Sequence, residues 1–210
     1  MQDIISILKK VGAILPNGHF VGTSGRHMDT YITKDALFPH TQVVSMIGKM
    51  FAEKYRDTDV EVVVGPAIGG IILSQWVAFH LSELKKKEVL SVYTEKTADN
   101  NQVFNRGYGS LVKGKKILVI EDTVTTGGSV KKSIESAKRD GGDVIGVCVM
   151  VNKDPDQINE VALGAPFSAL GELEVKTYEA KDCPLCKAGV PINTTFGHGK
   201  KFLELRTFHK

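Results

Sequence analysis

Residues 117–130 constrain the fold of this chain more than any other segment, because an apolar run there leads through two acids into a glycine turn. The run ends in Glu121 and Asp122, and residues 123–129 are rich in hydroxyl groups and glycine. From Val130 onward, apolar residues recur at helical spacing. The order predicts a buried strand, an acidic pair, a loop and a helix.

The loop after the acidic pair is suited to binding a phosphate group. Backbone N–H groups at the start of a helix point outward and favour an anion. Gly127 and Gly128 permit the close approach that a phosphate needs, and neighbouring hydroxyl groups add donors. Carboxylates repel phosphate but accept hydrogen bonds from sugar hydroxyls, so the predicted ligand is a sugar phosphate. The alternative is an ordinary turn that caps a helix.

Strand and helix patterns alternate along most of the chain, which predicts an α/β fold with a parallel sheet. Residues 152–210 are less regular, contain four prolines and are expected to form late strands and an appended flap. Helical spacing appears in residues 2–14, 40–55, 71–84 and 129–140, and apolar strand patterns in 60–64, 88–93, 116–120 and 143–151.

A second glycine-rich loop, residues 65–70, also follows a predicted strand. In parallel sheets, ligands bind beyond the carboxyl ends of the strands, so this loop and residues 121–129 can line one crevice. The ligand would then be a ribose that carries phosphate groups at two ends. A tight strand–helix turn without a ligand is the alternative for this loop alone.

Two polar segments are further candidates. Residues 94–106 contain Lys96 and Arg106, and a cation there could stabilise a departing pyrophosphate; a solvated hairpin is the alternative. Residues 18–31 combine aromatic rings with hydrogen-bond donors, as binding of an oxygen-rich planar base would require. A polar β-hairpin with a turn at 23–26 is the equally ordinary interpretation.

Composition limits the partners of the chain. The net charge of +3 gives no signal for nucleic acid or a membrane, and no secretory signal is visible, so the cytoplasm is the expected location.

Three cysteines do not make a disulfide framework, and Cys148 lies in a strand pattern and is expected in the core. Cys183 and Cys186 form a C-x-x-C that we interpret first as a structural turn. Half of a zinc site and a redox pair remain alternatives, although His198 and His209 lie at spacings unlike those of a zinc finger.

The segment 117–130 resembles the phosphoribosyl-diphosphate (PRPP) signature of type I phosphoribosyltransferases. Together with residues 18–27, 34–37, 65–70, 95–96, 106–108 and 182–189, it makes most of the chain similar to the orotate branch of that family. The resemblance implies a single domain, residues 1–210, with a parallel sheet flanked by helices. Its core is expected at about 39–151, with a small hood subdomain from about 1–38 and part of 152–210.

The resemblance also implies an activity: orotate and PRPP give orotidine 5′-monophosphate and pyrophosphate in the presence of Mg²⁺. A homodimer is implied in which the 94–106 loop reaches the neighbour's active site. Glu121, Asp122 and Lys96 are the expected catalytic residues, and Asp122 is a candidate Mg²⁺ ligand. The other expected roles are 5′-phosphate binding by Thr123, Thr125, Thr126, Gly127, Gly128 and Ser129, pyrophosphate binding by Ala67, Ile68, Gly69, Gly70, Lys96 and Arg106, and base binding by Phe20, Thr23, Arg26, Tyr31 and Lys153.

The chain departs from the family pattern at positions that concern the loop and the base. Many members carry an Arg-Lys pair where this chain has Glu95-Lys96, and the usual downstream Lys and His of the loop are missing. Lys153 stands near the place of an arginine that holds the orotate carboxylate, and Thr23 replaces a lysine of some members. A purine-base phosphoribosyltransferase, or a non-catalytic regulator that senses PRPP or a nucleobase, is therefore the alternative function.

Overall fold

The computed structural model describes residues 3–207, which form two compact units. The first unit contains residues 38–173 together with the residues before Ile7, and the second contains residues 7–37 and those from 174 onward. The boundary between the two units falls within helix α1 (Ile4–Lys10), because the first segment of the first unit ends at Ser6 and the second unit begins at Ile7.

The first unit is built around a six-stranded sheet with strand order β10-β9-β8-β5-β6-β7. Neighbouring strands are parallel except for β7, which pairs with β6 in the antiparallel direction. The predicted α/β class with a parallel sheet is confirmed. The strands are β5 (Val62–Pro66), β6 (Leu90–Lys96), β7 (Gln102–Val103), β8 (Lys116–Val124), β9 (Asp143–Asn152) and β10 (Phe167–Glu172), and the helices are α3 (Thr41–Lys54), α4 (Gly69–Lys85), α5 (Tyr108–Val112), α6 (Gly128–Arg139) and α7 (Glu160–Leu163).

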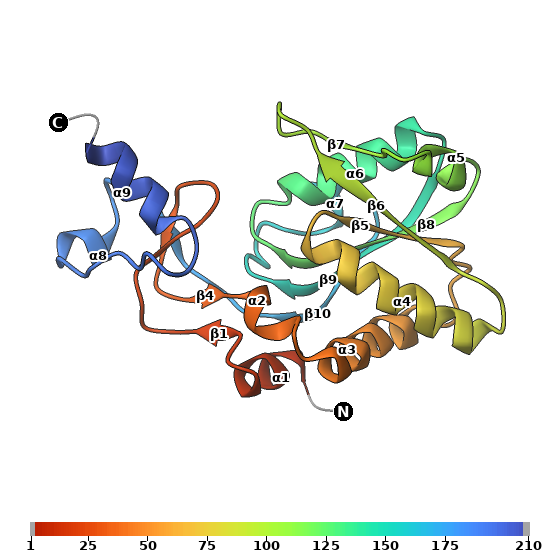
Figure 1. Ribbon diagram of the computed structural model, residues 1–210, viewed down its shortest axis with the longest axis horizontal. Coiled ribbons are helices and arrows are strands. Elements are labelled where there is room, and N and C mark those ends of the chain that lie inside the picture. The colour runs from red at the N-terminus through yellow and green to blue at the C-terminus, as the bar shows by residue number, and fades with distance from the viewer. Residues whose placement is uncertain (1–2, 208–210) are drawn as a thin grey trace. The chain divides into compact units, whose positions relative to one another are not determined.

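Helices cover both faces of this sheet (Figure 1). Helix α6 packs on one face through Val130, Ile134 and Ala137, the apolar stripe predicted from the sequence, and these side chains join alternate residues of β5, β8 and β9 in one buried cluster. Helices α3 and α4 pack together on the other face. Because both faces are covered, the central strands are almost continuously apolar, and each buried aliphatic side chain contributes about 1.5–3 kcal/mol.

Two boundaries beside the acidic pair and the 65–70 loop differ from the sequence prediction in ways that affect the site. Strand β8 does not end before the acidic pair but continues to Val124, because Glu121 and Thr123 pair with Val149 and Val151 of the neighbouring β9. Helix α4 begins at Gly69 instead of residue 71, which leaves only Ala67 and Ile68 between it and β5. The acids therefore lie within β8 because this strand pairs with the long strand β9. Local composition does not predict this extension of the strand.

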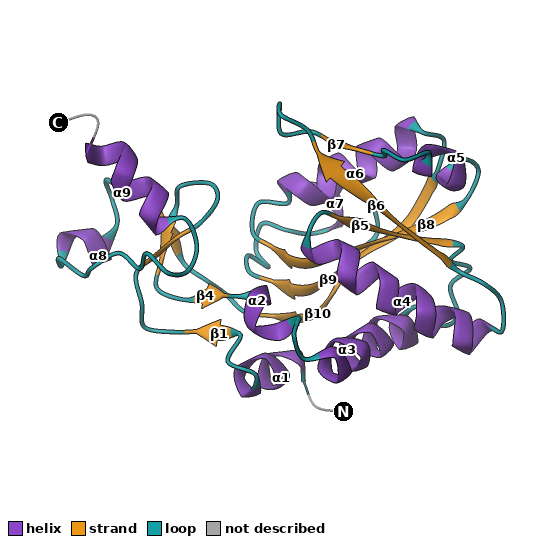
Figure 2. Ribbon diagram, viewed as in Figure 1, coloured by secondary structure: helices purple, strands orange, loops and turns teal. Residues whose placement is uncertain are grey.

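The second unit is made of very short strands (Figure 2). A three-stranded antiparallel sheet has the order β11-β3-β2, and β1 pairs with β4. The predicted hairpin with a turn at 23–26 is present, closed by a hydrogen bond from the Gly22 N–H to the Arg26 carbonyl. The elements are β1 (Ile14–Leu15), β2 (Phe20–Val21), β3 (His27–Met28), β4 (Tyr31–Ile32), α2 (Lys34–Leu37), β11 (Thr177–Tyr178), α8 (Pro184–Lys187) and α9 (Gly199–Thr207).

Within residues 3–207, no helix has the length and apolar character needed to cross a membrane.

The accessibility of Cys148 to a thiol reagent tests the packing of the main sheet. It lies in β9 with no exposed surface, and burial raises the pKa of its thiol to about 11. The thiol is therefore protonated and shielded at pH 8, and we expect Cys148→Ser to leave the time course of thiol labelling of the native chain by Ellman's reagent unchanged. Loss of one rapidly labelled thiol in Cys148→Ser would contradict this placement.

Candidate active site

Two loops meet at the carboxyl edge of the parallel sheet. Strands β5 and β8 are parallel neighbours, with Val62 opposite Ile117 and Val64 opposite Val119, so the loops that follow them leave the sheet side by side. The approach is very close, because a Cβ atom added to Gly69 would lie 2.1 Å from Oδ2 of Asp122. The 65–70 loop and the acidic pair therefore lie side by side at this edge of the sheet.

The glycines of the 65–70 loop are required by this packing. A Cβ atom on Gly65 would lie 2.0 Å from the carbonyl oxygen of Gly70, and one on Gly70 would lie 2.9 Å from the carbonyl oxygen of Ile120. The Ala67 N–H donates to the Thr94 carbonyl at 2.9 Å, which ties the loop to β6 as well. The peptide bond between Ala67 and Ile68 is cis, and the Ile68 side chain is exposed.

The acidic pair is held in place by the backbone of β8. The Asp122 N–H donates to Oε1 of Glu121 at 3.0 Å, and the Thr123 N–H donates to Oδ1 of Asp122 at 2.5 Å. Glu121 is 7% exposed and Asp122 8% exposed, so both carboxylates are almost buried at the strand end. Oxygen acceptors fixed in this way can orient hydroxyl groups of a sugar and favour a nearby positive charge.

The start of α6 has the features of an anion site. Gly127 precedes the helix with φ +74°, and as a glycine it has no side chain with which to cap the first turn. The first N–H groups of this 12-residue helix thus remain available to a ligand. Thr126, Gly128 and Ser129 are exposed beside them, and Thr123 and Thr125 are partly exposed.

Residues 94–106 form a hairpin, which was the alternative interpretation of this segment. Strands β6 and β7 pair at Glu95–Val103 and Lys96–Gln102. Glu95 accepts hydrogen bonds from Asn105 and Arg106, which lower the pKa of its carboxyl group. Arg106 is thereby bound within its own hairpin, and Lys96 is exposed at the end of β6.

The residues predicted to bind the base are divided between the two units. Lys153 belongs to the first unit, and its N–H donates to the Val124 carbonyl at the end of β8. Phe20 and Tyr31 of the second unit stack with ring centroids 5.5 Å apart. Arg26 is engaged by Glu179 and Thr177, and Thr23 hydrogen-bonds His198 at 3.1 Å.

The structure also brings together residues that the sequence analysis did not connect. Thr94 and Ser133 are fully buried, and their hydroxyl groups hydrogen-bond at 3.0 Å between β6 and α6. His19 and His27 lie beside Cys183 and Cys186 in the second unit. The sequence contains these hydroxyl, imidazole and thiol groups in plain view. It does not reveal that they are neighbours, because the residues of each group lie far apart along the chain.

Comparison with known proteins agrees with this geometry. Residues 33–162 match the family described as phosphoribosyl transferase domain, which gives the class of protein. An orotate phosphoribosyltransferase of Caldanaerobacter subterraneus subsp. tengcongensis is 38% identical over 191 residues, which are 91% of this chain and 94% of the relative. One of Thermotoga maritima is also 38% identical, over 94% of this chain and all of the relative.

Solved structures show the same fold. The crystal structure of orotate phosphoribosyltransferase from Aeropyrum pernix superposes with a TM-score of 0.63 and 26% identity, covering 81% of this chain and 93% of that one. The chain belongs to the phosphoribosyltransferase family and, within it, to the group of the orotate phosphoribosyltransferases.

The two glycines at the start of α6 give a matched test of the loop. Gly127→Ala places a Cβ atom at positive φ and 2.8 Å from Leu163, whereas Gly128→Ala meets nothing closer than 3.8 Å. We expect Gly127→Ala to lower the free energy of unfolding by about 1–3 kcal/mol and Gly128→Ala to change it by less than about 0.5 kcal/mol, measured by urea denaturation without ligands. Equal effects of the two substitutions would contradict the described backbone.

Proposed function

We propose that this chain transfers the phosphoribosyl group from PRPP to orotate, giving orotidine 5′-monophosphate and pyrophosphate in pyrimidine nucleotide biosynthesis. The observation that carries the proposal is the contact of Gly69 with Asp122, which joins two loops suited to the two ends of PRPP. The relatives named orotate phosphoribosyltransferase, which cover more than nine-tenths of the chain, support orotate as the acceptor.

In the proposed reaction the acidic pair binds the ribose. Glu121 and Asp122 accept hydrogen bonds from the ribose hydroxyl groups and stabilise the positive charge that develops at C1′ as pyrophosphate leaves. The orotate nitrogen attacks C1′ from the opposite face, so no covalent intermediate with the enzyme is required. The almost buried position of both carboxylates strengthens this electrostatic effect, because little water competes with it.

The two loops fix the phosphate groups. Residues 123–129 and the first N–H groups of α6 bind the 5′-phosphate and so orient the ribose. The loop Ala67, Ile68, Gly69 and Gly70 binds the pyrophosphate. Lys96 and Arg106 add positive charge as the pyrophosphate departs; the exposed pair of Arg106 with Glu95 is easily broken, since exposed pairs are worth about 0–1 kcal/mol.

The carboxylates at the end of β8 fit the Mg²⁺ ion that the family resemblance implies. Mg²⁺ prefers oxygen ligands, and Asp122 presents carboxylate oxygens beside the proposed pyrophosphate loop. Asp122 is therefore the residue proposed to contact the ion, directly or through water. When bound, Mg²⁺ neutralises charge on the diphosphate oxygens.

Base recognition is assigned to the aromatic and basic residues named above. Tyr31, which is partly exposed and stacks on the buried ring of Phe20, offers a ring surface to a planar base, while Lys153 and Arg26 offer positive charge to a carboxylate. Thr23 adds a hydroxyl group. The same proposal gives the second unit the role of a hood that holds the base. It also places the enzyme in the cytoplasm.

A homodimer with a shared active site is also proposed. Met46 of α3 and Phe79 of α4 are 40% and 49% exposed, so each of these two helices offers apolar surface to a second copy. Sedimentation analysis that finds only monomer at assay concentrations would contradict the dimer.

Replacement of the acidic pair tests its catalytic role. We expect Glu121→Gln with Asp122→Asn to lower turnover by about 100-fold or more at saturating PRPP, because fixed electrostatic partners of a transition state have effects of this size. The measurement is the PRPP-dependent loss of orotate absorbance. Asp143→Asn, at the opposite end of the neighbouring strand β9, is the matched control and should keep parental turnover. Near-parental turnover of the double variant would refute the assigned role.

The proposed specificity for orotate is tested by comparing several bases as acceptors under identical conditions. With PRPP and Mg²⁺, we expect nucleotide formation from orotate at a kcat/KM at least about 100-fold above that from uracil, adenine, guanine, hypoxanthine or xanthine, since a site built for a carboxylate discriminates strongly against bases without one. Product formation is followed by chromatography. Faster reaction of a purine would replace orotate in the proposal, and no reaction with any base would favour a non-catalytic sensor.

A further inference from the structure

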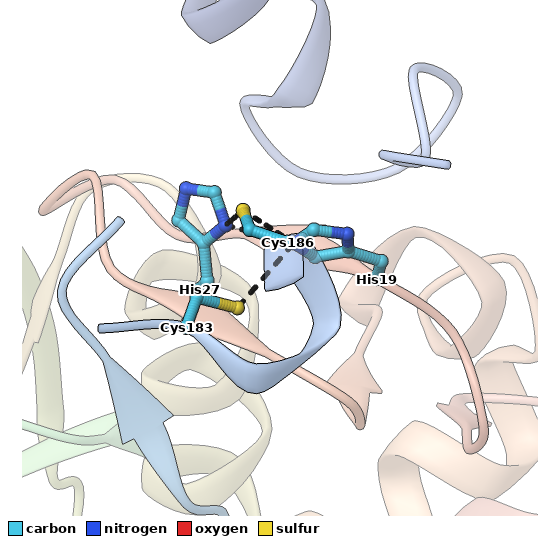
Figure 3. Close-up of side chains that lie close together, drawn as sticks. All are labelled: His19, His27, Cys183 and Cys186. Carbon is cyan, nitrogen blue, oxygen red and sulfur yellow. Dashed lines mark hydrogen bonds between the residues drawn. The ribbon is translucent and has the colours of Figure 1, made fainter. Parts of the chain in front are cut away.

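Four side chains of the second unit converge on one point (Figure 3). His19 immediately precedes β2 and His27 lies in β3, while Cys183 caps the start of α8 and Cys186 lies within it. One ligand atom from each residue lies within 4.8 Å of the others. His19, His27 and Cys183 are buried, and Cys186 is partly exposed.

The separations between these atoms suit a common metal ion. A tetrahedral ion with bonds of about 2.0–2.1 Å to nitrogen and about 2.3 Å to sulfur places its ligands about 3.3–3.8 Å apart. Nε2 of His19 lies 3.7 Å from each of the two sulfur atoms, and Nδ1 of His27 lies 3.4 Å from Sγ of Cys186. The two imidazole nitrogens are closer, at 2.8 Å, and would separate by about half an ångström around an ion.

A hydrogen bond outside the cluster orients His19 as a ligand. Its Nδ1 lies 2.7 Å from the Val190 carbonyl and donates to it, which directs the lone pair of Nε2 toward the other three side chains. Histidine ligands of zinc commonly donate their second N–H to a carbonyl in this way. The Val190 N–H in turn donates to the Leu185 carbonyl, so the orienting group belongs to the same turn as Cys186.

The shape of the second unit gives the cluster a structural purpose. The strands are two residues long, and the unit joins two segments that are far apart in the sequence. Small units of this kind bury little apolar surface and commonly gain stability from an additional cross-link or metal. Each segment supplies two ligands, so an ion would tie residues 19 and 27 to residues 183 and 186. The ring of Phe202 in α9 packs against the ring of His27 in a T-shaped arrangement, with centroids 4.7 Å apart, and helps to shield it.

We propose that Nε2 of His19, Nδ1 of His27, Sγ of Cys183 and Sγ of Cys186 bind one structural Zn²⁺ ion. Two thiolates and two imidazoles in a buried tetrahedral arrangement are a ligand set that favours zinc. All four positions are filled by protein, which leaves none for a substrate or water, so the ion stabilises the unit and does not take part in catalysis. The complete burial of Cys183 argues against a redox pair, which a reductant must reach.

Metal analysis of the full chain, purified without chelator, tests the proposal. We expect about one zinc per chain in the parent and in Cys148→Ser, the matched control whose sulfur lies in the main sheet, and loss of zinc in Cys183→Ser and in His27→Ala. Removal of the zinc with dipicolinate should lower the melting temperature of the parent by at least about 5 °C, and added zinc should restore it.

Cobalt substitution keeps the test decisive if the variants do not fold. Parent protein loaded with Co²⁺ should show the intense visible bands of a tetrahedral site and a sulfur-to-cobalt charge-transfer band. The proposal is overturned by a parent that contains no zinc and gives no such spectrum, by zinc that remains in Cys183→Ser, or by a native disulfide between Cys183 and Cys186. Stoichiometric iron or copper in place of zinc would overturn the choice of metal.

Discussion

The close approach of Gly69 to Asp122 is the constraint on which the candidate active site depends. It is possible because β5 and β8 are parallel neighbours and because three glycines remove the side chains that would separate the loops. Any larger residue at these positions would push the acidic pair away from the loop, or the start of α4 away from β5 and β8. The main sheet, buried on both faces, supplies the rigid edge against which this packing is maintained.

Local sequence patterns predict much of this arrangement. The apolar run before Glu121, the glycine turn and the helical stripe from Val130 predict the strand, loop and helix, and their alternation predicts the parallel sheet. Two strand–loop–helix segments in such a sheet are enough to place both loops at one edge. The extension of β8 through the acids was not predictable in this way, because the pairing partner that extends it, β9, follows later in the chain.

Other parts of the site depend on contacts that no local pattern reveals. Arg106 was predicted from its charge alone, and its pair with Glu95 follows from the register of a hairpin that the sequence left ambiguous. Arg26 likewise meets Glu179, a residue more than 150 positions away. Local patterns conceal the cluster of two histidines and two cysteines for the same reason, because the histidines that lie beside the C-x-x-C come from the N-terminal part of the chain.

The discontinuity of the second unit has a consequence for biosynthesis. Residues 7–37 leave the ribosome before the main sheet, but β3 cannot pair with β11, and His19 cannot meet Cys183, until residues 174–183 have been translated. At about 5–20 residues per second, the N-terminal segment waits for roughly 7–30 seconds while the strands of the main sheet emerge. During that interval its apolar residues have no partners from the C-terminal segment, so the nascent chain exposes surface that the finished protein buries.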